Sequence, residues 1–131
     1  MFPEILDKVE EVMVKNPLTI DSGRMLIDAA RLMEEKNIGS LIVVESGKCV
    51  GLVTERDFLR IAAAGIDMRV TSIKEQMRKP AISCQPSTRV MEAYLLMKKY
   101  QVRHLPVLSK DRTPVGMVTM RDLLTVGELR L

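Results

Sequence analysis

Two short motifs hold the polar residues of this sequence that could bind a ligand. Thr54 and Asp57 are three residues apart, and the same pair returns 65 residues later as Thr119 and Asp122. This spacing is typical of a capping box, in which a hydroxyl and a carboxylate satisfy free backbone amides at the start of a helix. The same geometry suits a nucleotide, because such amides attract phosphate and a carboxylate can accept both hydroxyls of a ribose. The motifs alone leave both interpretations open.

The residues before the two motifs differ in charge. Arg103 and His104 precede the second motif, whereas Gly39 and Ser40 stand at the equivalent positions 64 residues earlier. An arginine offers a planar fork that suits phosphate oxygens, and a histidine can add charge near neutral pH. A histidine beside a strand can equally be a packed, hydrogen-bonded side chain. On the first interpretation, the second half should bind phosphate better than the first.

Each motif also contains an arginine, Arg56 or Arg121, which could reach phosphate, form a dimer salt bridge or lie on a solvated helix face. A neutral purine needs apolar area with a few fixed polar groups. Most residues that could form such a pocket are also ordinary core positions. In the second half they are Ile82, Ser83, Val102 and Pro106, and in the first half they are Leu18, Thr19, Ile38 and Ile42. Ser40, at the position equivalent to His104, is a further candidate ligand-binding residue.

The two motifs belong to a duplication that spans most of the chain. Met33 returns as Met97, 64 residues later, and one extra residue near 110–113 accounts for the larger offset of the motifs. A period of this length indicates a duplicated supersecondary unit, whose copies stack to bury a shared apolar face. We place the repeats at residues 9–65 and 73–128, with a groove between the two halves.

Hydrophobic periodicity and turn residues predict the same order of elements, β-α-β-β-α, in each half. In the first half the predicted elements are an extended piece at 18–20, a helix at 24–36, strands at 41–44 and 49–53, and a helix at 54–64. In the second half they are a helical turn at 73–77, an extended piece at 81–84, a helix at 88–100, strands at 105–108 and 115–118, and a helix from 121. A further helix should open at Pro3 and stop before Pro17. The predicted fold is α/β (α+β), with a three-stranded sheet and two helices on one side in each half.

Composition and charge exclude several functions. The 131 residues suit one compact domain or two small halves with a common core, and the net charge of +3 comes from interspersed acids and bases rather than from a basic tail. The sequence has no metal-site spacing, nucleophile elbow or phosphate-binding loop, and Cys49 and Cys84 give no disulfide framework. No apolar run approaches the ~20 residues of a membrane span, and the start lacks a secretory signal pattern, which predicts a cytoplasmic protein.

The chain resembles the cystathionine-β-synthase (CBS) domain family in three features. These are the element order, the motif Gly-apolar-apolar-Thr-x-x-Asp at the last helix of each half, and the segment Lys-Lys-Tyr-Gln-Val-Arg-His-Leu-Pro-Val at 98–107. The pair of repeats looks like a Bateman module of that family. The resemblance covers nearly the whole chain.

This resemblance implies a module that binds an adenosine-containing ligand, such as AMP, ADP, ATP or S-adenosylmethionine, in a cleft between the repeats. It implies that Asp57 and Asp122 bind ribose, and that Arg103 and His104 bind phosphate. Such modules regulate an attached enzyme or transporter and commonly pair into a flat homodimeric disc. Because no catalytic signature accompanies the repeats, the resemblance implies a free-standing regulatory protein that acts on an unidentified partner and requires no cofactor.

Two other functions remain open at the level of sequence. The 20 Lys and Arg residues suggest a nucleic-acid-associated module, which would bind duplex DNA with a steep salt dependence. Alternatively, the chain is a structural dimerisation scaffold whose clefts are empty and whose motifs are caps only. Whatever its function, we expect the module to be a homodimer or larger, because wide aliphatic helix faces leave apolar area to cover. The candidate dimer surface is Phe58, Leu59, Leu123 and Leu124.

Overall fold

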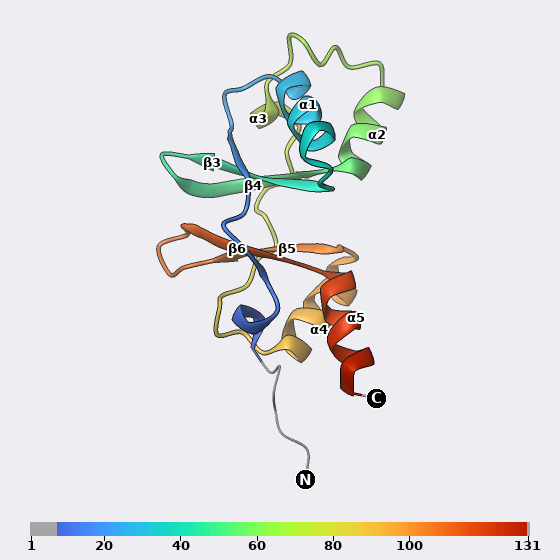
Figure 1. Ribbon diagram of the computed structural model, residues 1–131. Helices are drawn as coiled ribbons and strands as arrows, with labels where there is room; N and C mark the ends of the chain where they lie inside the picture. Colours follow the sequence, from blue (N-terminus) through green and yellow to red (C-terminus); the bar gives the residue numbers. More distant parts are fainter. Residues whose placement is uncertain (1–7, 131) are drawn as a thin grey trace. The chain divides into compact units, whose positions relative to one another are not determined.

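The structure is a computed structural model that describes the backbone of residues 8–130 and the side chains of residues 8–125 (Figure 1). The chain forms two compact units. The central unit is Leu18–Ala81, and the terminal unit combines Met1–Pro17 with Ile82–Leu131. Each unit contains a small sheet and several helices, which confirms the predicted mixed α and β fold. Residues 8–17 therefore belong to the same compact unit as the second repeat.

The central unit is built on a sheet with the strand order β2-β3-β4. Its strands are β2 (Thr19–Asp21), β3 (Ser40–Glu45) and β4 (Lys48–Thr54), and its helices are α1 (Leu26–Lys36), α2 (Glu55–Ala63) and α3 (Ile73–Gln76). Because β2 runs parallel to β3, the chain crosses between them through α1, whereas β3 and β4 form an antiparallel hairpin. The helices cover one face of the sheet (Figure 1). The predicted order β-α-β-β-α is confirmed here.

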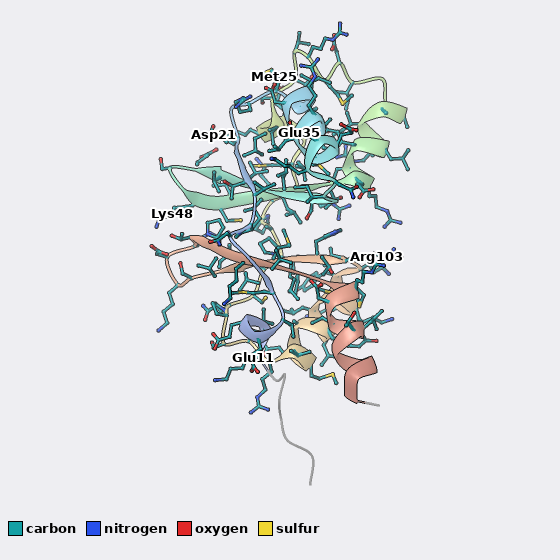
Figure 2. The ribbon with its side chains drawn as sticks, in the orientation of Figure 1. Glu11, Asp21, Met25, Glu35, Lys48 and Arg103 are labelled. Atoms are coloured by element: carbon teal, nitrogen blue, oxygen red, sulfur yellow. The ribbon has the colours of Figure 1, made fainter. Side chains whose placement is uncertain are left out.

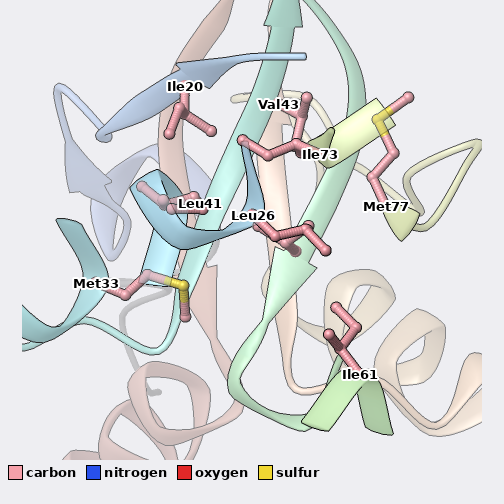
Figure 3. Close-up of a cluster of buried hydrophobic side chains, with 10 residues drawn as sticks. Ile20, Leu26, Met33, Leu41, Val43, Ile61, Ile73 and Met77 are labelled. Carbon is pink, nitrogen blue, oxygen red and sulfur yellow. The ribbon is translucent and has the colours of Figure 1, made fainter. Parts of the chain in front are cut away.

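The helices and sheet of the central unit enclose an aliphatic core (Figure 3). On α1, Leu26, Ala29 and Met33 recur at three- and four-residue spacing and therefore share one buried face. On β3, Leu41 and Val43 alternate onto the same side of the strand. The buried members of the core are Ile20, Leu26, Ala29, Met33, Leu41, Val43, Val53, Ile61, Ile73 and Met77. This core fixes α2, and with it the first Thr-x-x-Asp motif, against the end of β4.

The terminal unit has a sheet with the strand order β1-β6-β5. Its strands are β1 (Val14–Lys15), β5 (His104–Leu108) and β6 (Pro114–Thr119), and its helices are the 3-10 turn η1 (Val9–Glu11), α4 (Val90–Tyr100) and α5 (Met120–Arg130). β5 and β6 form an antiparallel hairpin, as β3 and β4 do in the central unit. The buried core consists of Val9, Cys84, Ala93, Met97, Leu105, Val107, Val118 and Leu123.

The prediction of an opening helix that ends before Pro17 is wrong for the described residues. The chain forms η1 and then β1, which pairs antiparallel with β6 so that Val14 faces Met117. Two features favour this pairing: β6 offers unpaired backbone groups at its edge, and Gly116 has no side chain in the place that Met13 fills. The predicted start of the helix, at Pro3, lies outside the described residues.

The extended piece predicted at 81–84 runs beside β5 but forms a single bridge there instead of a third strand. Only Cys84 pairs with β5, through its N–H to the Pro106 carbonyl at 3.0 Å and its carbonyl to the Leu108 N–H at 2.8 Å. In the central unit the equivalent pairing continues, because Ser22 donates its N–H to the Val44 carbonyl at 3.0 Å. The residue equivalent to Ser22 is Pro86, which has no N–H to donate. β1 is therefore the third strand of the terminal sheet.

The candidate dimer surface divides between core and solvent. The side chains of Leu59 and Leu124 are 73% and 54% exposed. Phe58 packs partly against the core of the central unit, and Leu123 is buried in the core of the terminal unit. The prediction is therefore wrong for Leu123 and partly wrong for Phe58, because adjacent positions on a helix lie about 100° apart and cannot share one face.

No helix within residues 8–130 is both long enough and apolar enough to cross a membrane.

Candidate functional site

The capping box predicted at the second motif is present in the terminal unit. The backbone N–H of Thr119 donates to Oδ2 of Asp122 at 2.9 Å, and the N–H of Asp122 donates to the Thr119 hydroxyl oxygen at 3.2 Å. The other carboxylate oxygen of Asp122, Oδ1, accepts no hydrogen bond from the part of the chain that the structure describes. The Asp122 carboxylate is half-buried. Capping uses its Oδ2 and leaves Oδ1 able to accept hydrogen bonds from hydroxyl groups.

The basic pair Arg103 and His104 lies next to this motif. His104 faces Thr119 across the β5–β6 hairpin, and the N–H of Met120 donates to the Arg103 carbonyl at 2.9 Å. The exposed Arg103 side chain lies at the end of the sheet from which α5 starts (Figure 2). The structure therefore brings together Arg103, His104, the N-terminus of α5 and the Asp122 carboxylate, which uses one oxygen in the cap, at one edge of the terminal unit.

The apolar candidates of the second half follow the same strand. Ser83 precedes Cys84, whose N–H donates to the Pro106 carbonyl at 3.0 Å, so 82–84 runs beside β5. Val102 leads into β5 after α4, with its N–H bonded to the Met97 carbonyl at 3.0 Å. Ile82 and Val102 are half-buried and pack against the terminal core, and Pro106 is buried. Ile82 and Val102 therefore also contribute to the fold.

The buried Cys84 of the terminal unit is unsuited to nucleophilic chemistry. Burial raises the pKa of the Cys84 thiol to about 12, and the nearby Glu92 adds to the effect. At neutral pH this thiol is protonated and is a poor nucleophile. Among the described residues, no cluster of His, Cys, Asp and Glu side chains could hold a metal ion.

The first motif also forms a capping box, at the start of α2. The N–H and the hydroxyl of Thr54 donate to Oδ2 of Asp57 at 2.9 and 3.2 Å, and the N–H of Asp57 donates to the Thr54 hydroxyl oxygen at 3.4 Å. Unlike Asp122, however, Asp57 has its second carboxylate oxygen engaged. Nε of Arg78 donates to Oδ1 of Asp57 at 2.9 Å, and an Arg60 nitrogen lies 3.9 Å from the same oxygen.

This network around Asp57 could not be found from the motif. Arg78 follows α3, and its backbone forms two hydrogen bonds with Leu52 of β4, at 3.0 and 3.1 Å. Arg60 of α2 donates to the side-chain and backbone oxygens of Gln76 at 3.0 and 3.3 Å. As a result the Asp57 side chain is only 1% exposed. A sequence signal exists only in the alignment of the repeats, in which Arg78 corresponds to Val14.

The other candidates of the first half are distributed along the equivalent elements. Glu55 donates its N–H to the Gly39 carbonyl at 3.0 Å, which reproduces the bond between Met120 and Arg103. Ser40 is buried opposite Thr54. Of the remaining residues, Leu18 and Thr19 are exposed, Ile38 is half-buried against the central core, Ile42 is buried, and Arg56 and Arg121 are exposed.

Comparison with known proteins matches the chain to one family twice. The sequence model of the CBS domain matches residues 9–64 and 70–128. The CBS domain-containing protein YhcV of Bacillus subtilis is 33% identical over 119 residues, which are 90% of this chain and 84% of that protein. An inosine-5'-monophosphate dehydrogenase of Nitrosopumilus maritimus is 33% identical over 113 residues, which are 86% of this chain but only 22% of that enzyme.

A solved structure shares the fold over nearly the whole chain. The CBS domain pair of protein MJ0100, in complex with 5'-methylthioadenosine and S-adenosyl-L-methionine, has a TM-score of 0.87 and 27% sequence identity. The match covers 95% of this chain and 98% of that one. Both repeats match the family, and each unit carries the same hairpin and the same capped motif at its last helix. The protein therefore belongs to the CBS domain family, with two CBS repeats in one chain.

Proposed function

We propose that this protein is a regulatory module that binds an adenosine-containing ligand reversibly and passes its occupancy to a partner protein. The candidate ligands are AMP, ADP, ATP and S-adenosylmethionine. One observation carries the proposal: among the described residues, none donates a hydrogen bond to Oδ1 of Asp122 at the N-terminus of α5, and Arg103 lies beside this motif. The complex of protein MJ0100 with two adenosyl ligands supports the choice of ligand class.

We propose that each group holds a different part of the ligand. Oδ1 of Asp122 accepts ribose hydroxyl protons while Oδ2 remains in the cap. The Arg103 guanidinium and the positive end of the α5 dipole bind phosphate or a carboxylate. Ile82, Val102 and Pro106 supply apolar area for the purine. A ligand with a ribose and an anionic group satisfies this arrangement better than either part alone.

Regulation follows from binding only if the ligand prefers one of two arrangements of the protein. We propose that the chain does this without catalysis of its own, as a homodimer that presents its two states to another protein. The exposed Leu59 and Leu124 side chains support dimerisation. Cys49 and Cys84 are buried and form no disulfide within the described residues, which supports a location in the reducing cytoplasm.

Isothermal titration calorimetry against ATP, AMP, S-adenosylmethionine and NADH tests the proposal. Asp122→Asn should weaken the best ligand by about tenfold or more, because the amide keeps an acceptor for the Thr119 N–H and replaces the free oxygen by a donor. Glu92→Gln, an exposed acid on α4 of the same unit, is the matched control and should bind as the wild type does. Equal affinity in Asp122→Asn and wild type would return Asp122 to a purely capping role.

A further inference from the structure

We propose that Arg78 decides which of the two repeats accepts the ligand. Its guanidinium occupies the carboxylate of Asp57, so that the first repeat binds no adenosyl ligand and Asp122 of the second repeat is the ligand-binding acid. This inference rests on the proposed function, and it adds a specificity-determining residue that lies outside both Thr-x-x-Asp motifs.

The hydrogen bonds of Asp57 leave no place for a ribose. Oδ2 accepts from the Thr54 N–H and hydroxyl, and Oδ1 accepts from Nε of Arg78 at 2.9 Å. A ribose hydroxyl would have to displace the guanidinium from a carboxylate that is 1% exposed. A charge-assisted bond is stronger than a neutral one, and removing Arg78 would leave the buried carboxylate with only the longer contact to Arg60, at 3.9 Å. The exchange is therefore unfavourable for the ligand.

The backbone holds Arg78 in this position. Its N–H and carbonyl form hydrogen bonds of 3.0 and 3.1 Å with Leu52, and Met77 packs where Gly51 has no side chain. Arg60 adds a second cation, 3.9 Å from Oδ1 of Asp57. Although the Arg78 side chain is 45% exposed, its attachment at the edge of β4 keeps Nε within reach of the carboxylate.

The terminal unit provides the comparison, because its backbone repeats the same pairing with different side chains. Val14 pairs with Met117 as Arg78 pairs with Leu52, and Val14 cannot donate a hydrogen bond from its side chain. The position of Arg60 is taken by Thr125, whose hydroxyl donates to the Arg121 carbonyl at 2.9 Å. Both cations that face the acid of the first repeat are therefore missing from the second.

At the candidate phosphate position it is the second repeat, not the first, that carries the cations. The second repeat has Arg103 and His104 where the first has Gly39 and Ser40. The first repeat thus has cations on its acid and no charge at the phosphate position, while the second repeat has a basic pair at the phosphate position and a free carboxylate oxygen. Both differences favour the second repeat as the ligand site.

The chain itself suggests two reciprocal variants. Arg78→Val gives the first repeat the residue that the second has, and Val14→Arg does the reverse. In calorimetry with ATP and with S-adenosylmethionine, the wild-type chain should bind one ligand. Arg78→Val should bind a second one, and the further change Asp57→Asn should remove it. Val14→Arg should weaken the wild-type site by about tenfold or more, because the new guanidinium can reach Oδ1 of Asp122.

The controls separate this inference from the proposed function. Lys79→Ala removes the neighbouring exposed cation and should leave the number of sites at one. Two equal sites in the wild type, or a single site in a folded Arg78→Val together with unchanged affinity in Val14→Arg, would overturn the inference and leave the proposed function intact. No binding in any of the chains would overturn the proposed function. If Arg78→Val loses cooperative thermal unfolding, Val14→Arg alone decides, since it leaves the central unit unchanged.

Discussion

The carbonyl oxygen of Arg103 accepts the backbone N–H of Met120 at 2.9 Å, and this bond fixes the arginine beside the first turn of α5. Gly39 makes the same bond with Glu55 at 3.0 Å in the central unit. The two repeats therefore share the backbone geometry of this corner and differ in the side chain that it presents. Only the corner of the second repeat presents a cation.

We expect Arg103→Ala to weaken ATP binding far more than adenosine binding. A charge-assisted phosphate contact contributes about 1.5–3 kcal/mol, which corresponds to roughly ten- to a hundredfold in affinity. Adenosine has no phosphate, so its affinity should not depend on this contact. Calorimetry with the two ligands measures the ratio. Lys110→Ala, an exposed cation in the β5–β6 turn at the other end of the hairpin, is the control. A parallel loss for ATP and adenosine would contradict a phosphate role.

Much of the fold follows from local sequence signals. The helices and hairpins fall within a few residues of their predicted bounds, because their apolar spacing and turn residues are local. The pairing of Val14 with Met117 is not local: it depends on the edge of a strand about a hundred residues further along the chain. The apolar spacing of Val9, Val12 and Met13 fits a helix equally well, so periodicity could not distinguish the two.

The candidate site was predicted in part for a similar reason. Both capping boxes follow from residues three positions apart, and the structure shows them. The motif is the same in both repeats, so it could not predict their difference. Both oxygens of Asp57 accept hydrogen bonds, whereas Oδ1 of Asp122 accepts none from the described residues. That difference comes from Arg78, which lies 21 residues from Asp57 and reaches it only through the edge of β4.

The start of α1 should make stability depend on pH. Nε of Arg24 and the N–H of Met25 donate to Asp28, and together they hold the pKa of Asp28 below its ordinary value, with Arg24 the larger cause. A carboxyl whose pKa is lower in the folded state contributes stability above its unfolded pKa, and the contribution is lost as the pH falls through the folded pKa. Asp28→Ala should therefore lower the melting temperature at pH 7, and the difference from wild type should shrink below about pH 4.

Thermal unfolding followed by circular dichroism at pH 7 and at pH 3 measures this difference. Glu35→Ala, an exposed acid near the end of the same helix, controls for a general effect of alanine on α1. A difference between Asp28→Ala and wild type that stays the same at both values of pH would contradict the ionic origin of the contribution.

The protein should be a dimer whose contact includes α2 or α5. Leu59 and Leu124 occupy equivalent positions on these helices and are 73% and 54% exposed. Each repeat therefore exposes a leucine to solvent at the same position of its last helix. The double variant Leu59→Glu with Leu124→Glu should reduce the mass measured by light scattering to that of one chain. Val70→Glu, which changes a 74% exposed valine between α2 and α3, should leave the mass unchanged. A wild-type mass of one chain at tens of micromolar would refute the dimer.

A substitution at Gly51 should disturb the contact between Arg78 and Asp57 by displacing the Arg78 backbone. A Cβ atom at position 51 would lie 2.8 Å from the Arg78 carbonyl oxygen, which cannot rotate away as a flexible side chain can. Gly51→Ala should therefore push Arg78 off the edge of β4 and destabilise the protein by about 1–3 kcal/mol, the usual effect of overpacking. Gly23→Ala is the control, because its Cβ would meet only the Asp21 side chain, at 3.3 Å. Urea unfolding measures the loss for both variants. If Arg78 excludes ligand from the first repeat, folded Gly51→Ala should also gain weak ligand binding at the first repeat. A loss of stability without that gain would mean that the Arg78 guanidinium still contacts Asp57 in this variant.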